Sequence, residues 1–423
     1  MQKRFIKFPV NFLWGTATSS HQIEGDCQNN DWSHETFRKY KDKVPWVKQA
    51  LEKIPDVGTS CDSFNRYKED FDLIQKMNNN CHRLSIEWAR IEPEEGKFDS
   101  QAIKHYRNVL EDLKKRNIKI MLTLHHFTNP AWFMLKKGWE KGKNKKYFLR
   151  YVKYAVENLG DLVDFWVTIN EPDVYVFCSY FHGWWPPMKK KTLLGFRVFW
   201  NLAKAHKSAY VLIHRIVKQN FNKQAEVGIA NSLQAYSNYI KHKLFDQLQQ
   251  YYLYKFSNHG FYILSRPKYH DFFGINYYFQ VRLKKKYRFG KRSLSMQEDP
   301  AVEGRRMTDM NWLVHPHGIY EVLVDLSTYG KPIYITENGI ATEDDSFRKQ
   351  FIHEHLEEIY YAIKAGVDVR GYFYWSLLDN YEWAEGYRPR FGLASVDFET
   401  KQRQLKESSE YYAKISKQNG IFL

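Results

Sequence analysis

The sequence contains little cysteine and no long hydrophobic run. The four cysteines among 423 residues are Cys27, Cys61, Cys81 and Cys178, with no CxxC spacing. They are too few for a disulfide scaffold of this size, so we expect reduced thiols. No apolar run approaches the roughly 20 residues that span a bilayer. Residues 1–9 also lack the apolar core of a secretory signal, so we expect a cytoplasmic protein.

Acidic residues are outnumbered, because 64 Lys and Arg against 48 Asp and Glu give a net charge of +16. That excess raises the question of nucleic-acid binding. The sequence shows no Arg-rich recognition helix, zinc-finger spacing or RNA-binding sheet motif, so we expect no nucleic-acid partner. Basic clusters mixed with aromatics occur at 184–191 and 284–292. We interpret them as solvated loops; the alternative is weak peripheral contact with anionic membrane or amphiphilic substrate.

Low-complexity linkers and internal repeats are also missing, which predicts a single domain over residues 1–423. Short β-rich runs alternate with helical patterns such as 100–116 and 351–364. The candidate strands are 12–16, 81–85, 119–124, 165–170, 227–231, 272–276, 332–336 and 371–375. Most are near-continuous apolar runs, as expected of strands buried on both faces. Eight strands alternating with helices predict an α/β fold, a (β/α)8 TIM barrel.

Polar side chains follow several of these strands, where a barrel places its catalytic groups. They are His125, His126, Asn170, Glu171, Asn231, Asn276, Tyr277, Tyr278, Glu337, Asn338 and Trp375. Glu171 follows the fourth strand and Glu337 the seventh, so the two carboxyl groups are expected to face each other across the mouth. Opposed carboxyl groups suit glycosidic bond cleavage, although each alone could be a salt-bridge partner.

The chain resembles glycoside hydrolase family 1, the retaining β-glycosidases, and within it the archaeal-type β-glucosidases. The segments that carry the resemblance are FPVNFLWGTATSSHQIEG (8–25), RLSIEW (83–88), LTLHHF (122–127), TINEP (168–172), GINYY (274–278), ITENG (335–339) and YWSLLDNYEW (374–383). They occur in the family's order over nearly the whole chain. Phe127 departs from the Trp of many members, although archaeal-type members often have Phe there.

The resemblance implies a role for each residue of the catalytic pair. Glu171 is expected to be the acid/base and Glu337 the nucleophile, with Arg83 as the cation beside Glu337 and Tyr278 as its hydrogen-bond donor. Asn276 matches a supporting position near the nucleophile. Burial and the charge of Glu337 would raise the pKa of Glu171, which must be protonated to act as an acid. Neither metal nor cofactor is expected.

The resemblance also implies the sugar-binding residues. Asn170 matches the residue that holds the 2-hydroxyl, Trp375 matches the aromatic floor, and the hydroxyl-binding positions are Gln22, His126, Glu382 and Trp383. Because Glu382 would repel a phosphate, unphosphorylated β-D-glucosides and β-D-galactosides are the expected small-molecule substrates.

The aglycone and the partners are less constrained by the sequence. We expect the loops at 132–139 and 184–191 to rim the mouth and to favour apolar or alkyl aglycones. His353 and His355 do not share a helix face, so we interpret them as exposed helix polarity rather than a metal pair. Two alternative functions are left open: a transglycosylase using the same ester, and a non-catalytic sugar- or membrane-surface-binding barrel. The sequence also leaves a homo-oligomer open.

Overall fold

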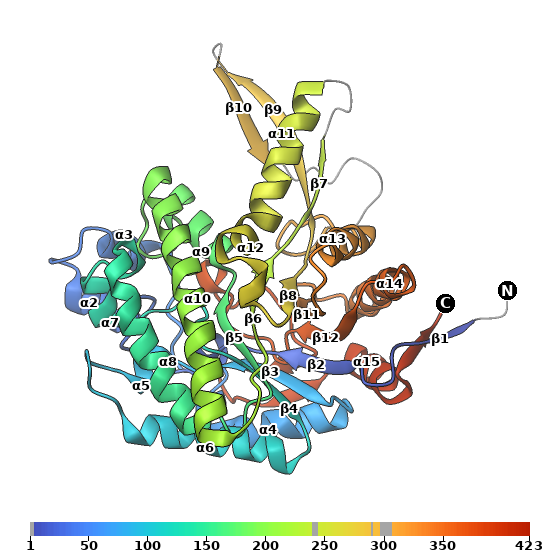
Figure 1. Ribbon diagram of the computed structural model, residues 1–423, viewed down its shortest axis with the longest axis horizontal. Helices are drawn as coiled ribbons and strands as arrows, with labels where there is room; N and C mark the ends of the chain where they lie inside the picture. The colour runs from blue at the N-terminus through green and yellow to red at the C-terminus, as the bar shows by residue number, and fades with distance from the viewer. Residues whose placement is uncertain (1–3, 239–243, 289–290, 297–306) are drawn as a thin grey trace.

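A closed parallel barrel of eight strands forms the centre of the computed structural model, which describes residues 4–238, 244–288, 291–296 and 307–423 (Figure 1). In chain order the barrel strands are β2 (Leu13–Ala17), β3 (Cys81–Ser85), β4 (Lys119–Thr123), β5 (Phe165–Asn170), β6 (Val227–Ser232), β8 (Phe273–Asn276), β11 (Ile333–Asn338) and β12 (Val369–Trp375). Each overlaps one predicted strand, so the predicted barrel is confirmed. The last strand, β12, pairs with the first, β2, and closes the barrel.

The barrel strands are buried on both faces, which explains their continuous apolar runs. Inside, Leu13, Met121, Val167 and Phe373 belong to one buried cluster. Outside, the strands pack on helices through a much larger cluster. A filled interior of this kind leaves room for ligands only at the strand ends.

Seven longer helices surround the barrel. They are α4 (Ser63–Lys76), α6 (Ser100–Lys115), α8 (Lys145–Leu159), α10 (Thr192–Phe221), α13 (His317–Ser327), α14 (Asp345–Lys364) and α15 (Glu407–Gln418). Helix α6 begins where the Asp99 carboxylate accepts from the backbone of Gln101 and Ala102, and it buries Ile103 and Leu110. Such N-caps satisfy donors that the helix itself leaves free. The two helical predictions, at 100–116 and 351–364, are confirmed.

Shorter elements connect the strands and helices. The α-helical ones are α1 (Ser20–Ile23), α2 (His34–Tyr40), α3 (Val47–Lys53), α5 (Trp88–Ile91), α7 (Ala131–Leu135), α9 (Pro172–Val176), α11 (Leu244–Tyr254) and α12 (Gly260–Ser265). Two π-helices, η3 (Phe177–His182) and η4 (Lys255–His259), and the 3-10 helices η1 (Gly138–Glu140), η2 (Gly142–Asn144), η5 (Pro267–Tyr269) and η6 (Trp383–Glu385) complete the set in the described residues. Outside the barrel, β7 (Ala235–Asn238), β9 (Gln280–Arg288) and β10 (Lys291–Met296) form a three-stranded sheet, and β13 (Ala394–Val396) pairs with β14 (Arg403–Leu405). The chain ends pair as β1 (Phe5–Lys7) and β15 (Gly420–Phe422) (Figure 1).

Several sequence expectations can be checked against the fold. All four cysteines are free and buried, as predicted. In the described part of the chain, no helix has the length and apolar character needed to cross a bilayer. The prediction for His355 is wrong: its ring is fully buried, stacks on Phe351 and bonds to the Phe351 carbonyl, because this face of α14 packs inward. The side chains of the 284–292 cluster lie outside the described residues.

Candidate active site

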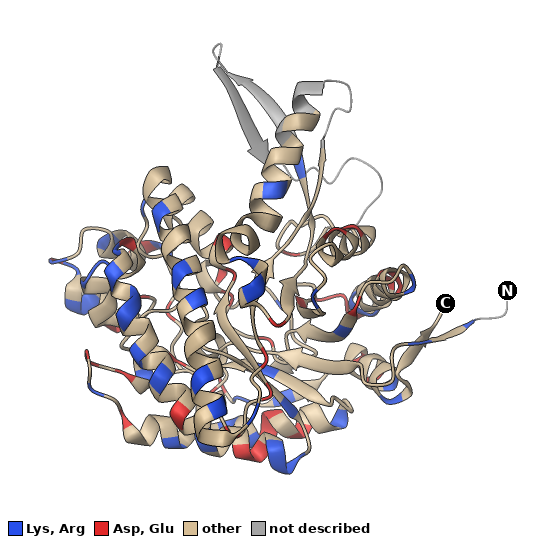
Figure 2. Cartoon of the chain, viewed as in Figure 1, with Lys and Arg blue, Asp and Glu red and all other residues tan. Residues whose placement is uncertain are grey.

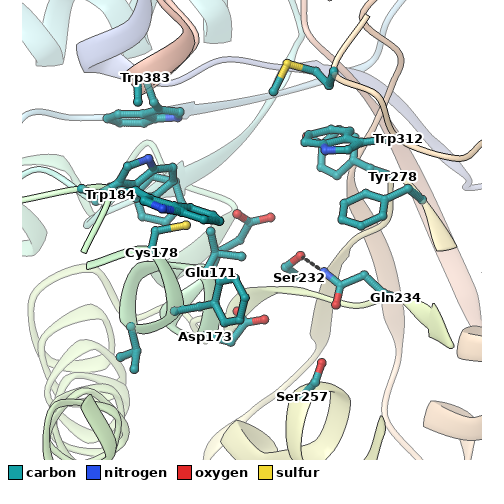
Figure 3. Close-up of a pocket in the computed structure, with 18 of the residues that line it drawn as sticks. Glu171, Asp173, Cys178, Trp184, Ser232, Gln234, Ser257, Tyr278, Trp312 and Trp383 are labelled. Carbon is teal, nitrogen blue, oxygen red and sulfur yellow. Dashed lines mark hydrogen bonds between the residues drawn. The ribbon is translucent and has the colours of Figure 1, made fainter. Parts of the chain in front are cut away.

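A cavity of about 850 Å³ lies beyond the carboxyl ends of the barrel strands (Figure 3). Eight of the eleven predicted site residues line it: Gln22, His126, Glu171, Tyr278, Glu337, Trp375, Glu382 and Trp383. The other three, Arg83, Asn170 and Asn276, are buried behind the wall and hydrogen-bond to lining groups. The fold therefore brings the predicted residues together.

Glu337, in β11, is held from two sides. Arg83 Nη1 donates to its Oε1 at 2.5 Å, and the Tyr278 hydroxyl donates to its Oε2 at 2.6 Å. Arg83 Nη2 donates to Asn170 Oδ1 at 2.6 Å. Arg83 is 1% exposed and Glu337 3% exposed, so this is a buried ion pair whose geometry must be good to offset desolvation. One guanidinium thus positions both Glu337 and Asn170.

Glu171 sits at the junction of β5 and α9, where its backbone adopts a left-handed φ of 40° and Pro172 begins the helix. This turn stops the strand and places the carboxyl group on the cavity wall. Asn276 Nδ2 donates to Glu171 Oε1 at 2.8 Å and lies 3.2 Å from Asn170 Oδ1. The same amide also helps to lower the pKa of Glu337, so one side chain influences both carboxyl groups.

The two carboxyl groups differ in their electrostatic surroundings. Burial raises the pKa of Glu171 well above its usual value, and the negative charges of Glu337 and Asp173 raise it further. Burial also raises the pKa of Glu337, but there Arg83 and Tyr278 oppose the shift. A proton shared between the two groups therefore resides on Glu171. The site can present one acid and one carboxylate at the same time.

The opposite wall carries polar atoms without partners in the described structure. Gln22 Nε2 donates to the Tyr381 carbonyl at 2.8 Å and to Glu382 Oε2 at 3.3 Å, which leaves Gln22 Oε1 unpaired. Asn170 Nδ2 lies 3.1 Å from His126 Nε2, and His126 Nδ1 is unpaired. Burial holds the pKa of His126 well below its usual value, so the ring is neutral. Buried polar atoms left open in a cavity are suited to ligand hydroxyls.

Aromatic rings flank these atoms. The His126 ring stacks on Trp383 at 6.0 Å and on Trp375 at 5.9 Å between centroids. Glu382 is partly buried beside Gln22, and burial and the charge of Glu337 raise its pKa to about 8. Flat apolar faces beside hydroxyl-binding groups match the alternating faces of a sugar ring.

Some predictions fail in this region. Trp184 and Trp185 line the cavity as predicted, but the 132–139 loop does not. Trp139 is 1% exposed and donates to Asn129, because this loop folds down onto α8 instead of over the mouth. Asn338 supports the structure by bonding to the Tyr277 carbonyl and the Tyr372 hydroxyl.

The sequence analysis missed an apolar half of the cavity. Its walls come from α9, both π-helices, α10, α11, β7 and the segment before α13. The missed residues include Asp173, Val174, Phe177, Phe181, Phe199, Tyr236, Leu253, Phe256 and Trp312. Phe256 and Ser257 belong to η4, and Phe177, Cys178 and Phe181 to η3. Single-turn π-helices recur at functional sites, but sequence periodicity carries no signal for them. We call this half of the cavity the aromatic lobe.

The described residues include no group of three or more His, Cys, Asp or Glu side chains that could hold a metal ion. Comparison with known proteins, a separate line of evidence, identifies a family. The sequence matches the family described as "Glycosyl hydrolase family 1" over residues 4–263 and 235–421. "Beta-glucosidase A" of Thermotoga maritima is 31% identical over 462 aligned positions, covering 98% of this chain and 99% of that protein.

Two further matches agree with that family. "Beta-galactosidase" of Pyrococcus woesei is 28% identical and covers 98% of each chain. Among solved structures, a β-glycosidase from Pyrococcus horikoshii is 37% identical, with a TM-score of 0.87 over 99% of this chain and 96% of that one.

Proposed function

We propose that Glu337 is the nucleophile and Glu171 the general acid and base of this enzyme. The chain belongs to glycosyl hydrolase family 1 and is a retaining glycoside hydrolase of the β-glucosidase type. The observation that carries this assignment is the unequal pairing of the two groups. Glu337 is ion-paired with Arg83, whereas Glu171 accepts a hydrogen bond from the neutral amide of Asn276. An ionised nucleophile and a protonated acid follow from that difference.

In the first step, the Glu337 carboxylate attacks the anomeric carbon as the bond from that carbon to the glycosidic oxygen breaks. The Glu171 proton passes to the departing oxygen, and the sugar becomes an ester of Glu337. Esterification removes the Glu337 charge that helped to raise the pKa of Glu171. Glu171 is then a stronger acid and remains ionised once its proton has gone.

In the second step, Glu171 takes a proton from water while the water oxygen attacks the anomeric carbon. The ester bond to Glu337 breaks, and both carboxyl groups return to their initial states. Two inversions restore the β configuration, as in other retaining glycosidases.

The polar wall opposite the carboxyl pair is proposed to hold the sugar. Polar atoms for the sugar hydroxyl groups come from Gln22 and His126, which each have an unpaired buried atom, and from the carboxyl group of Glu382. Flat ring faces come from Trp375 and Trp383. Asn170, fixed by Arg83, is proposed to hold the 2-hydroxyl, a contact that strengthens in the transition state. The relatives named above support terminal β-D-glucosyl and β-D-galactosyl residues as substrates.

The aromatic lobe is proposed to hold the aglycone. It adjoins Glu171, and its lining includes Phe177, Phe181, Phe199 and Phe256. Each methylene buried among such side chains contributes up to about 0.8 kcal/mol. We therefore propose that alkyl and other apolar aglycones are preferred to sugars.

This preference predicts a kcat/KM for n-octyl β-D-glucoside at least about tenfold above that for cellobiose, with the octyl glucoside below its micellar concentration. Burying two methylene groups contributes enough free energy for about that factor. Initial rates with both substrates measure it. Phe256→Ser is expected to shrink the ratio, and Phe422→Ser, which alters an exposed ring on the terminal strand β15, is expected to leave it unchanged. A higher kcat/KM for cellobiose would reject the preference.

The aromatic lobe continues onto an exposed surface of α10. The Phe196 ring contacts Phe181 and Phe256 at 5.3 and 5.5 Å, and Trp200 lies one turn further along α10. Phe196 and Trp200 are each 44% exposed, and Lys204 lies 5.1 Å from the Trp200 ring. Helix α10 carries Lys and Arg along its length and no acidic residue (Figure 2). Exposed aromatics beside lysines support weak peripheral binding to anionic membrane or amphiphile surfaces.

Binding to vesicles tests that surface. At low salt we expect sedimentation with vesicles containing phosphatidylglycerol and not with pure phosphatidylcholine vesicles, because each lysine near an anionic surface contributes about 1 kcal/mol. Lys204→Glu with Lys207→Glu is expected to weaken binding at least tenfold. Lys104→Glu with Lys115→Glu makes the same change of charge on the exposed side of α6. Equal loss in both double variants would show a general charge effect and contradict a specific surface.

The domain organisation, the location and the oligomeric state are also proposals. We propose one catalytic domain over residues 1–423 that acts in the cytoplasm. A related structure, 29% identical with a TM-score of 0.85, is described as a β-glucosidase mutant derived from a hyperthermophilic tetrameric structure. That relative supports a homo-oligomer for this chain too.

A further inference from the structure

A strip of polar side chains interrupts the otherwise apolar wall of the aromatic lobe. Gln234 Nε2 donates to Ser232 Oγ at 2.7 Å, and the Tyr236 hydroxyl lies 2.8 Å from Ser257 Oγ. All four residues line the cavity, as does Asp173. Figure 3 shows Ser232 and Gln234 across the gap from Asp173, with Ser257 below them in this view. Polar groups thus face each other across a part of the cavity whose other lining residues are largely apolar or aromatic.

One carboxyl oxygen of Asp173 is the acceptor atom beside this strip that lacks a partner. This atom, Oδ1, is shielded from solvent and makes no hydrogen bond in the described structure. The side chain as a whole is partly buried and borders the cavity. Burial raises the pKa of the Tyr236 hydroxyl to about 12, and the charge of Asp173 adds to this shift. An unpaired carboxylate oxygen beside a ligand cavity is open to a donor brought by the ligand.

The position of Asp173 relative to Glu171 decides which part of a substrate it meets. Glu171 must contact the glycosidic oxygen, and the sugar lies toward Trp383 and Glu382. In Figure 3, Asp173 lies on the other side of Glu171 from Trp383. The aglycone therefore lies on the Asp173 side of Glu171, in a cavity that Phe199 and Phe256 also line.

We propose that Asp173, together with Ser232, Gln234 and Ser257, forms an aglycone subsite for a hydrogen-bond donor on one of the first carbons of an otherwise apolar aglycone. This proposal rests on the proposed function, because it assumes that the aromatic lobe receives the aglycone. The substrate class is an amphiphilic β-glycoside with a hydroxyl or amino group near the glycosidic bond and a hydrocarbon tail beyond it. Such a group pairs the carboxylate oxygen that an unsubstituted alkyl chain would leave buried and unpaired.

The test compares aglycones that differ only in the donor. The substrates are n-octyl, 2-hydroxyoctyl and 2-aminooctyl β-D-glucoside, below their micellar concentrations. In the wild-type enzyme, the ratio of kcat/KM for the hydroxylated to the plain octyl substrate is expected to be about tenfold. The ratio within one enzyme preparation is unaffected by the fraction that is folded. A role of Asp173 in folding alone would change both rates equally and leave the ratio constant.

Two variants locate the effect at Asp173. Asp173→Leu keeps the volume similar and removes the acceptor, so the ratio is expected to fall to about one. Asp173→Asn keeps an acceptor oxygen without charge, so it retains part of the preference for the hydroxyl and loses more of the preference for the amine. Asp42→Leu is the matched control, because it makes the same substitution at an exposed Asp that does not line the cavity. It is expected to keep the wild-type ratio.

The outcomes separate this proposal from the one it rests on. Equal rates for the three octyl glucosides in the wild type, or an unchanged ratio in both Asp173 variants, would overturn the donor subsite while leaving the apolar aglycone in place. If 4-nitrophenyl β-D-glucoside is hydrolysed but none of the octyl substrates is, the aglycone assignment itself fails, and the donor subsite fails with it.

Discussion

Replacing Glu337 by Ala is expected to lower kcat for β-glucosides by about 10⁴-fold or more. Without the carboxylate no ester can form, and the remaining groups only bind the sugar and protonate the departing oxygen. Arg83 then loses its ion-pair partner in a buried site, which destabilises the fold by a few kcal/mol. Thermal unfolding should accompany the kinetics, so that inactivity is measured on folded protein.

Chemical rescue separates a lost nucleophile from a damaged site. The space vacated in Glu337→Ala admits a small anion such as azide, which Arg83 attracts to the same face of the sugar. An aryl β-glucoside is then expected to give α-glucosyl azide, because a single displacement inverts the anomeric carbon. Appearance of the β-azide, or activity above one hundredth of wild type without azide, would contradict the role of Glu337.

Replacing Glu171 by Gln is expected to have the second-largest effect, and its size should depend on the departing group. For an alkyl β-glucoside, kcat/KM should fall by about 10² to 10⁴, the usual contribution of a general acid. From a dinitrophenyl glucoside, dinitrophenolate leaves without needing a proton, so the first step with this substrate should be nearly unaffected. Deacylation loses its base in either case, and a burst of phenol followed by slow turnover is expected. Equal losses for both substrates would exclude Glu171 as the acid.

The pH dependence follows from the same environment. Glu171 must be protonated to act, and burial with the Glu337 charge raises its pKa well above the usual value. Activity is therefore present below that raised pKa and lost as the pH rises through it. In the residual hydrolysis of 4-nitrophenyl β-D-glucoside, Glu171→Gln should abolish this basic limb, while the acidic limb, which reports protonation of Glu337, persists. A basic limb that survives the substitution would assign it to another group.

The barrel could be predicted because its strands are buried on both faces. Runs such as 119–124 and 332–336 are apolar without interruption, and the helices between them show regular spacing of apolar residues. The positions of Glu171 and Glu337 at strand ends mark them as site residues without any family resemblance. Residues from other loops, such as Gln22 and Glu382, were found through the family resemblance, since nothing local marks them as ligands.

The aromatic lobe could not be predicted because it depends on how separate elements meet. Phe177 and Phe256 come from two π-helices, whose extra residue per turn leaves no periodic pattern. Asp173 reads as an ordinary acidic residue at the start of a helix. The failed prediction for the 132–139 loop has a related cause. A Trp side chain such as Trp139 suits the hydrophobic core as well as the rim of the cavity, and only tertiary packing determines which position it takes.

The barrel closes where β12 meets β2, and this seam bears on how the enzyme is made. Just beyond it, Gln22 from the first loop bonds to Asn380, Tyr381 and Glu382 from the last. A growing chain on the ribosome already holds both reacting carboxyl groups when β12 has yet to be synthesised. Until then it lacks about half of the sugar-binding wall. An unfinished chain therefore contains both catalytic carboxyl groups but not the complete set of residues that bind the sugar.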